Sequence, residues 1–500
     1  MPLAPHPGKI GLQLRLCATA IIGATFGTGA LALTLSQQLS WPPLARAASA
    51  PAELPVHTPP PEPSARTQGA TTWATLLGGL DQAPPVREAQ ARAEASSAVG
   101  QQSEARAWWP RLDANLRTDQ QNQRYNGIAS RTPSSSTTLQ ATMPLWRPAE
   151  RADARADAAV AEQAQWQARL RRQSLARTLS QQYLDAVEAA EQARLTHAHL
   201  AALAQQAQAH QKRLQAGLGT VVDALETQAR QEQVLAQAEQ LRARLRTLTL
   251  TLNRLSGLSV LPPDGLSPDA PDSADVPLPP LPEALAQVLG SHPEVLDAQA
   301  GVRASMESLR ARDAERWQPT LDAIASRGRT RQTQRFEGVS DRQDIRSDAV
   351  GLVLNWPLFS GGLQQARQRE AAALLSAAQA RLDDAEARVG TDLQDAYQRH
   401  EQARYREARQ ASVVRSMQAT LNALQKAWLA GLRSTTDLLG AQQRLHEARL
   451  AWVSARVDTL QAGSDALALL GQLDAPHIAP WLALFNTAPS PFASSMPAMP

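Results

Sequence analysis

The hydrophobic pattern of the chain switches between two periods. Residues 112–116 and 139–143 carry apolar side chains at every second position, which is typical of a strand with one apolar face. The second half repeats this plan at 319–323 and 349–355. Turn-rich stretches between the strands of each pair, at 125–136 and 331–348, are interpreted as loops. The pattern therefore predicts two hairpins, with four strands of about ten residues.

Long runs without helix breakers occupy much of the remaining chain. Residues 149–216 contain neither glycine nor proline, and residues 363–430 contain one glycine, Gly390, and no proline. At about 1.5 Å per residue, a helix over either run would be on the order of 100 Å long.

Shorter helical patterns flank each long run. They cover about 86–108 and 220–256 in the first half, and about 293–317 and the stretch that ends near Leu470 in the second. Two short helices placed end to end have about the length of one long helix. We therefore expect coiled-coil packing of near-constant length.

The same corner follows both long runs. Residues 212–225 and 426–439 share the pattern K-x-x-x-A-G-L-x-[ST]-x-x-D-x-L, which indicates an internal duplication. In each copy, a glycine is suited to end one helix, a hydroxyl residue is suited to cap the next, and an aspartate lies in its first turn. These pairs are Gly217 and Gly431, Thr220 and Ser434, and Asp223 and Asp437.

The first fifty residues have the features of an export signal. Lys9 and Arg15 precede a largely apolar stretch, and residues 48–50 form an A-x-A cleavage site. A membrane-anchoring helix is the alternative, because the segment is long for a signal. Together with Arg46, these cations account for the formal charge of +3, so the mature chain is neutral. Its charge therefore offers no case for a nucleic-acid partner.

Composition and pattern together predict a mainly α fold with a small β part. Aromatic residues make up only 4% of the chain, which favours long helices over several mixed cores. Six segments follow: a signal peptide at 1–50, a flexible N-terminal segment at 51–84, a first repeat at 85–258, a Pro-rich linker at 259–282, a second repeat at 283–473 and a disordered tail at 474–500.

Four strands are too few to close a membrane barrel. Open sheet edges are not tolerated in lipid, and the smallest natural barrels have about eight strands. Either the hairpins are soluble, or several chains contribute strands to one barrel. The export signal and the duplicated plan favour the shared barrel.

The duplicated corner, the proline-flanked hairpins and the P-L-F-S-G-G motif at 357–362 resemble the TolC family of outer membrane efflux proteins. The resemblance covers nearly all of 85–473. It implies a homotrimer, with four strands per chain in a twelve-stranded outer membrane β-barrel and with the helices in a periplasmic α-barrel. Such an assembly would be the exit duct of a tripartite efflux pump or type I secretion system. Its partners would be a periplasmic adaptor protein and an inner membrane transporter, either ABC or proton-driven, and it would use no cofactor.

The resemblance also implies roles for the corner residues. Asp437 would form a pore-facing ring at the constriction, Asp223 and Arg433 a salt bridge that holds the tip closed, and Trp428 an aromatic gate. Gly440 stands where a second acidic ring position would be expected. The adaptor would dock on a tip made of Ala216, Gly217, Leu218, Thr220, Ala430, Gly431, Leu432 and Ser434.

Simpler roles stay open for these residues. Asp223 and Asp437 would also stabilise a helix by under about 1 kcal/mol as first-turn acids, and Arg433 would also suit a corner cap or a solvated position. Trp146, Trp356 and Phe359 lie at strand ends, where an aromatic belt at the membrane interface is favoured over core packing.

Two other classes of protein share parts of this pattern. A periplasmic adaptor also contains a coiled-coil hairpin, but it would need compact β-domains around a single hairpin. A soluble coiled-coil scaffold would be extracted from cells with buffer, without detergent. An enzyme is disfavoured, because the sequence has no nucleophile motif or phosphate loop, and the nearest histidine pair, His197 and His199, points two ways on a helix.

Overall fold

The fold is described from a computed structural model of the chain. The structure describes residues 72–125, 128–216, 220–260, 265–266, 278–336, 339–430, 432–482 and 484–485. All of them lie in one compact unit, Gly69–Pro500. The expected signal at 1–50, most of the linker at 259–282 and the corner residues Gly217, Leu218 and Gly431 lie outside the described residues.

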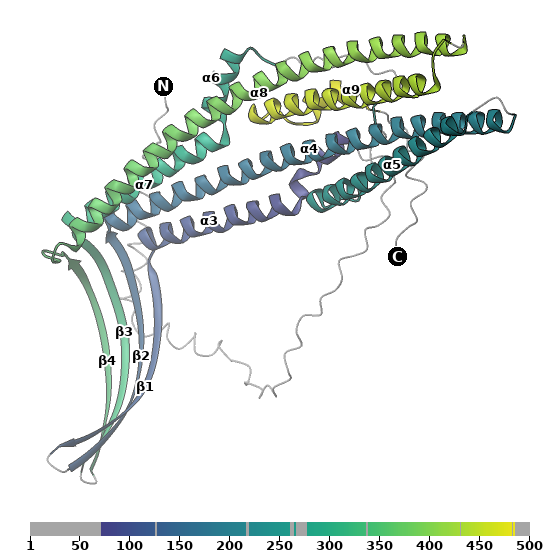
Figure 1. The fold of residues 1–500 in the computed structure, drawn as a ribbon. Helices are drawn as coiled ribbons and strands as arrows, with labels where there is room; N and C mark the ends of the chain where they lie inside the picture. Colours follow the sequence, from purple (N-terminus) through teal and green to yellow (C-terminus); the bar gives the residue numbers. More distant parts are fainter. Residues whose placement is uncertain are drawn as a thin grey trace. The chain divides into compact units, whose positions relative to one another are not determined.

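Helices and strands follow one another in a duplicated order (Figure 1). The first half consists of α3 (Pro84–Trp108), β1 (Arg111–Tyr125), β2 (Ile128–Trp146), α4 (Pro148–Gln215) and α5 (Val221–Ser256). The second half consists of α7 (Pro293–Trp317), β3 (Thr320–Phe336), β4 (Val339–Asn355), α8 (Leu363–Leu429) and α9 (Thr435–Leu469). Shorter elements are α2 (Trp73–Gly78), the 3-10 turn η1 (Leu80–Gln82), α6 (Leu281–Ser291) and α10 (Ala475–Leu482).

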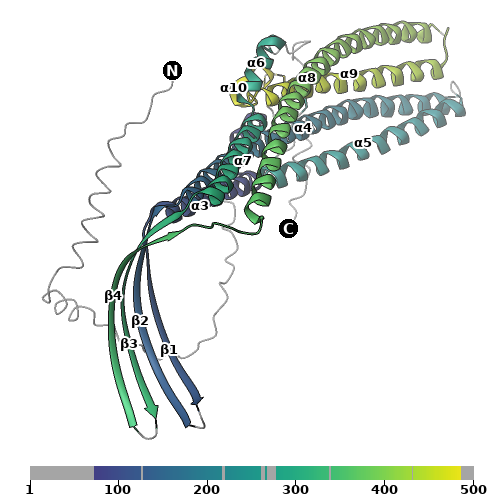
Figure 2. The ribbon, with the colours of Figure 1, turned by 90° about the vertical axis from the view of Figure 1, so that its left-hand side faces the viewer.

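The helices pack lengthwise around α4. This helix contacts α3, α5, α7 and α9, while α8 packs on α7 and α9. The shorter helices α3 and α5 follow each other along α4, as Figure 2 shows. More than half of the buried residues of α4 are alanines, whose small side chains let helix backbones approach closely. The predicted mainly α fold with a small sheet is confirmed.

No helix in the described part of the chain combines the length with the apolar character needed to cross a membrane.

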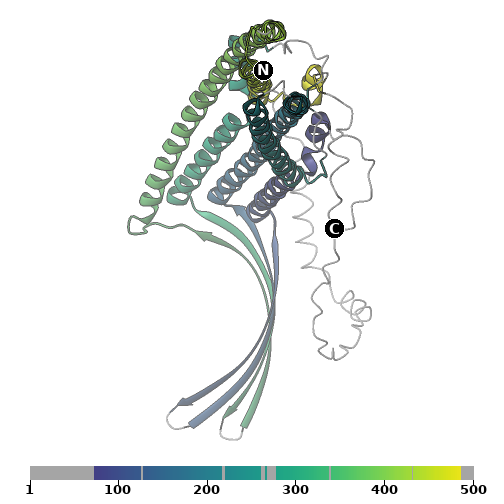
Figure 3. The same ribbon diagram turned by 45° about the vertical axis from the view of Figure 1, so that its right-hand side comes forward.

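The four strands form one antiparallel sheet in the order β1-β2-β3-β4. The central pair, β2 with β3, joins the hairpins of the two halves. Within one chain, β1 and β4 each pair on one side only. The sheet is visibly curved in Figure 3.

The strands are longer than the ten residues expected. They contain 15, 19, 17 and 17 residues, and pairing continues to Tyr125 opposite Ile128 and to Phe336 opposite Val339. The prediction of long loops at 125–136 and 331–348 was therefore wrong. The backbone ladder supplies its hydrogen bonds whatever the side chains are, so the strands extend beyond the point where the apolar alternation stops.

Parts of two segments expected to be flexible or disordered form helices. The elements α2 and η1 fall within 51–84, and α10 falls within 474–500. Trp73 of α2 is fully buried, stacks on Trp481 of α10 at 5.6 Å between ring centroids, and donates a hydrogen bond from Nε1 to Ser180 Oγ of α4 at 2.9 Å. The helices α2 and α10 are ordered because Trp73 and Trp481 stack on each other and are buried against the bundle.

Candidate functional site

The two helix corners begin their second helices in the same way. At the first corner, Thr220 Oγ1 accepts a hydrogen bond from the Asp223 backbone N at 3.1 Å. At the second corner, Ser434 Oγ accepts one from the Asp437 backbone N at 3.1 Å, and the Asp437 carboxylate accepts one from the Ser434 backbone N at 3.3 Å. The second corner is thus a complete capping box. The predicted caps are confirmed.

The charged residues of the corners have separate partners within one subunit. Arg433 approaches Asp437 at 4.0 Å, whereas the Asp223 carboxylate accepts a hydrogen bond from the Thr220 hydroxyl at 2.5 Å. Among the described residues, the structure does not bring Asp223 and Arg433 together. All four residues are exposed or half-buried.

Contacts between the two corners were missed by the sequence analysis. Thr436 Oγ1 donates a hydrogen bond to Glu226 Oε2 at 3.1 Å. The Arg213 guanidinium lies 5.0 Å from the ring centroid of Trp428, and Trp428 Nε1 donates a hydrogen bond to Thr435 Oγ1 at 3.4 Å. The tip of the α4–α5 hairpin is therefore attached to the tip of the α8–α9 hairpin. No local pattern reveals partners that lie 210 residues apart.

A second link between the hairpins is a pair of histidines. His199 of α4 and His446 of α9 stack with ring centroids 4.6 Å apart and planes at 13°. The Nε2 atoms of both rings are buried without a hydrogen-bond partner among the described residues. Burial, together with the neighbouring His199 ring, lowers the pKa of His446 to about 4, and burial also lowers the pKa of His199. A neutral pair therefore packs between the two halves.

The strand register gathers apolar residues on one face of the sheet. Side chains alternate between the two faces, and residues that are paired directly share a face. Three residues of each strand therefore form one set, which we call the apolar band. Its members are Leu112, Ala114 and Leu116; Leu139, Ala141 and Met143; Leu321, Ala323 and Ala325; and Val350, Leu352 and Leu354.

The apolar band crosses the strands obliquely. Ala114, in the middle of the band on β1, pairs with Leu139. The same row of paired residues continues through Arg327 on β3 to Asp348 on β4. The middle of the band on β4 is Leu352, which lies four residues from Asp348. Four residues of about 3.4 Å over three strand spacings of about 4.8 Å correspond to an angle of about 45°. Strands of membrane barrels tilt by about 35–45°, so such a tilt would bring the band level with a membrane.

Aromatic side chains lie at the helix end of the apolar band. A register shift between Pro144 and Trp146 pairs Trp146 with Leu321, so this bulge turns Trp146 to the apolar face. Trp356 and Phe359 are exposed, Phe359 by 90%. Their role in a membrane interface stays a prediction. Further exposed tryptophans adjoin the strands and were not singled out: Trp108, Trp109 and Trp317.

The strand-to-helix junctions of the two halves differ. Before α8, Gly361 and Gly362 adopt positive φ angles of 61° and 86°. Before α4, Arg147 takes their place with a φ of −137°. Its guanidinium binds both carboxylate oxygens of Asp322 at 2.7 and 2.8 Å and those of Glu150 at 2.7 and 2.9 Å. Ion pairs of Arg147, one of which links the two halves, therefore replace the glycine turn.

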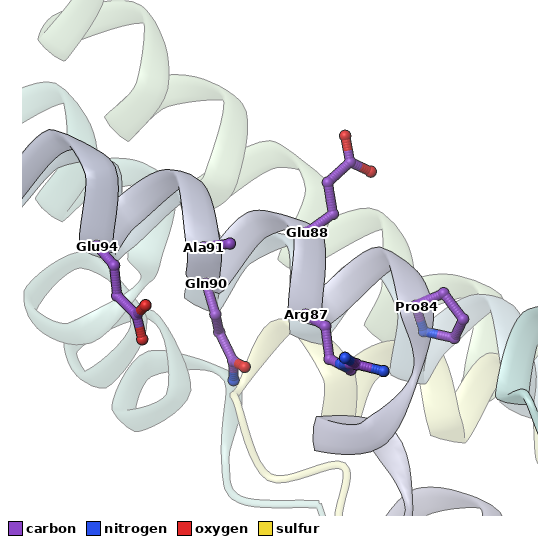
Figure 4. A pocket seen from close by; sticks show the side chains of 6 residues that line it. All are labelled: Pro84, Arg87, Glu88, Gln90, Ala91 and Glu94. Carbon is purple, nitrogen blue, oxygen red and sulfur yellow. The ribbon is translucent and has the colours of Figure 1, made fainter. Parts of the chain in front are cut away.

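The hollow along α3 is not shaped to enclose a small molecule. Its lining comes from that helix alone (Figure 4): Pro84, Arg87, Glu88, Gln90, Ala91 and Glu94. A wall from one helix cannot enclose a ligand. Within the described residues, no group of three or more His, Cys, Asp or Glu side chains is placed to hold a metal ion.

The chain is similar in sequence to several known proteins. The chain is 28% identical over 297 residues to the outer membrane efflux protein BepC of Brucella suis, covering 59% of this chain and 63% of that protein. It is 28% identical over 296 residues to the alkaline protease secretion protein AprF of Pseudomonas aeruginosa, covering 58% and 60%. The chain thus spans less than two thirds of the length of these two relatives. A third relative is the proteases secretion protein PrtF of Dickeya chrysanthemi, 28% identical over 64% of this chain and 69% of that protein.

Solved structures share the fold. A crystal structure of CusC matches with a TM-score of 0.68 and 16% identity over 80% of this chain and 92% of that chain. The outer membrane protein VceC of Vibrio cholerae matches with a TM-score of 0.66 and 17% identity over 80% and 96%. The sequence profile described as outer membrane efflux protein matches residues 79–258 and 284–472. Because these two ranges include most of both halves, the chain belongs to the outer membrane efflux protein family.

Proposed function

We propose that the protein is the outer membrane exit duct of a tripartite efflux pump or type I secretion system. It would pass substrates from a periplasmic adaptor and an inner membrane transporter to the exterior. The observation that carries the proposal is the duplicated pair of long-helix hairpins joined to a sheet with an oblique apolar band. The family supports an outer membrane location, and the names of BepC, AprF and PrtF support export.

A homotrimer would close the sheet. The edge strands β1 and β4 each have one unpaired side within a single chain, and such edges are not tolerated in lipid. Three copies would pair β1 of one subunit with β4 of the next in a twelve-stranded barrel. The band angle of about 45° matches the strand tilt of such barrels, with Trp146, Trp356 and Phe359 at the interface with outer membrane lipid.

The helix corners would form the periplasmic tip of the duct. Three copies of Asp437 would ring the constriction. Asp223 of one subunit would meet Arg433 of the next, because the described structure does not bring the two together within one chain. Trp428, held between Arg213 and Thr435, would narrow the opening. The adaptor would contact the tip residues Ala216, Gly217, Leu218, Thr220, Ala430, Gly431, Leu432 and Ser434.

Fractionation and electrophysiology test this function together. The full chain, expressed with its own N-terminus, should be found in the outer membrane fraction, require detergent for extraction and migrate as a trimer in unheated gels. In planar bilayers the purified trimer should conduct ions. A chain that extracts with buffer as a monomer would instead support a coiled-coil scaffold or an adaptor, and would refute the proposal.

A further inference from the structure

Arginines lie beyond the apolar band on β3 and β4, toward the turn that joins these strands. On the face that carries the band, the described side chains beyond it include five arginines and two aspartates, an excess of three positive charges. They are Arg327, Arg329 and Arg331 of β3, Arg342 and Arg346 of β4, and Asp344 and Asp348 of β4. Over the six residues that follow the band on β1 and β2, the same face is neutral, with Thr118, Gln120, Ser135 and Thr137, and Arg124 of β1 lies farther along. We call the seven charged residues the arginine patch.

The arginine patch lies at the height of a membrane boundary. Arg327 is four residues beyond Ala323 in the middle of the band, and Trp356 is four residues from Leu352 in the opposite direction. Four residues of a strand tilted by about 45° rise about 10 Å. The tryptophan and arginine levels are thus separated by about 20 Å, close to the apolar height of about 25 Å of outer membrane barrels.

The charges of the arginine patch are only partly neutralised within the sheet. Arg327, 79% exposed, lies 3.3 Å from Asp348. Asp344 is shared by Arg329, which hydrogen-bonds to it, and by Arg331 at 3.8 Å. Arg346 forms no salt bridge among the described residues.

Two of these cations face each other across the sheet. Arg329 and Arg346 are direct partners in the register of β3 and β4. Like charges in directly opposite positions are destabilising. The Asp344 carboxylate, bound by Arg329, offsets part of this repulsion, and a second anion between the two guanidinium groups would remove the rest. Guanidinium groups match phosphate geometry with two parallel hydrogen bonds. The pair is therefore suited to one phosphate group.

We propose that the arginine patch binds the phosphate groups of lipid headgroups in the outer leaflet of the outer membrane. The inference depends on the proposed function, because it needs the apolar band to lie in the membrane with the helices on the periplasmic side. The strand turns then point outward, and the patch lies at the headgroups of the outer leaflet. The excess positive charge selects a phosphorylated headgroup over a neutral one.

The test compares substitutions on the two faces of the sheet. The variant Arg329→Gln with Arg346→Gln removes the facing cations, and Arg346→Gln alone disturbs no salt bridge of the described structure. Arg117→Gln is the matched control, because Arg117 is an exposed arginine of β1 on the opposite face, 2.5 Å from Asp119. Phosphorus that copurifies with each detergent-extracted trimer is measured. The trimers are also titrated with vesicles of phosphatidylethanolamine with or without lipid A, the bisphosphorylated glucosamine disaccharide lipid.

The expected result is a several-fold loss of bound lipid phosphorus and of the response to lipid A in both Arg346 variants, with Arg117→Gln equal to the wild type. Equal phosphorus in all variants would overturn the inference, and so would an equal response to lipid A lacking its phosphates or to inorganic phosphate alone. The same preparations are run unheated and tested for conductance. A conducting trimer with unchanged lipid phosphorus refutes only this inference, whereas a wild type that is no membrane trimer refutes the proposed function.

Discussion

Gly463 of α9 lies directly beneath the indole of Trp481. A Cβ atom at position 463 would be 3.0 Å from Cη2 and Cζ2 of Trp481 and 3.4 Å from Cδ2 of His400. Trp481 has no room to withdraw, since it is buried and stacks on Trp73. The absence of a side chain at 463 thus allows the C-terminal helix α10 to pack on the bundle.

We expect Gly463→Ala to destabilise the protein by about 1–3 kcal/mol, because the extra methyl overpacks a rigid aromatic cluster. Thermal unfolding in detergent measures the effect as a lower transition temperature. Gly390→Ala is the control, since its Cβ would meet nothing within 4 Å, and alanine stabilises a helix interior by up to about 1 kcal/mol. Equal transition temperatures for the two variants would contradict the packing described.

The stacked histidines predict a loss of stability in acid. The pKa of His446 is about 4 in the folded chain against an ordinary 6.5, so the unfolded chain takes up the proton first as the pH falls. The contribution of neutral His446 to the free energy of unfolding is complete above pH 6.5. It is lost progressively down to about pH 4, by an amount on the order of 3 kcal/mol.

Substitution at position 446 tests this pH dependence. The charged groups that act on the pair are Arg230 of α5 and Glu447 and Arg449 of α9. We expect His446→Phe to keep the ring stack but to reduce the change of the unfolding transition temperature between pH 6.5 and 4. His477→Gln, at the exposed His477 of α10, is the control and should retain the wild-type slope. A slope that persists unchanged in His446→Phe would exclude His446 as its source.

The hydrogen bond between Thr436 and Glu226 predicts a looser tip when it is removed. Thr436→Val deletes the donor while keeping the shape of the side chain, at a cost of about 0.5–1.5 kcal/mol. In single-channel recordings we expect a higher conductance or more frequent opening than in the wild type. Thr435→Val, which removes only the acceptor of the 3.4 Å bond from Trp428, should act more weakly. A Thr436→Val channel indistinguishable from the wild type would show that this bond does not restrain the tip.

The proposed aspartate ring predicts block by cations. Three carboxylates around a narrow pore attract multivalent cations, so Asp437→Asn should reduce block by such ions at least tenfold in planar bilayers. The amide retains an acceptor for the Ser434 backbone N, which keeps the cap that the carboxylate forms at 3.3 Å. Asp223→Asn tests the aspartate of the other corner. Unchanged block in Asp437→Asn would remove this residue from the constriction.

Local signals in the sequence determined the helices. The predicted helix at 293–317 agrees with α7, and the glycine- and proline-free run at 149–216 agrees with α4 to one residue at each end. Corner caps such as Thr220 and Ser434 were equally visible. All of these features depend on residues within a few positions of one another, where backbone conformation and capping are decided.

Tertiary structure alone decided how these elements meet. The partners Trp73 and Trp481 lie at opposite ends of the described chain, and separately their segments have the composition of linkers. The slant of the apolar band and the facing of Arg329 with Arg346 follow from strand register. Pairing, stacking and the stability that they confer arise only when distant segments are brought together, because burial and cross-strand contact are properties of the packed chain and not of any one stretch.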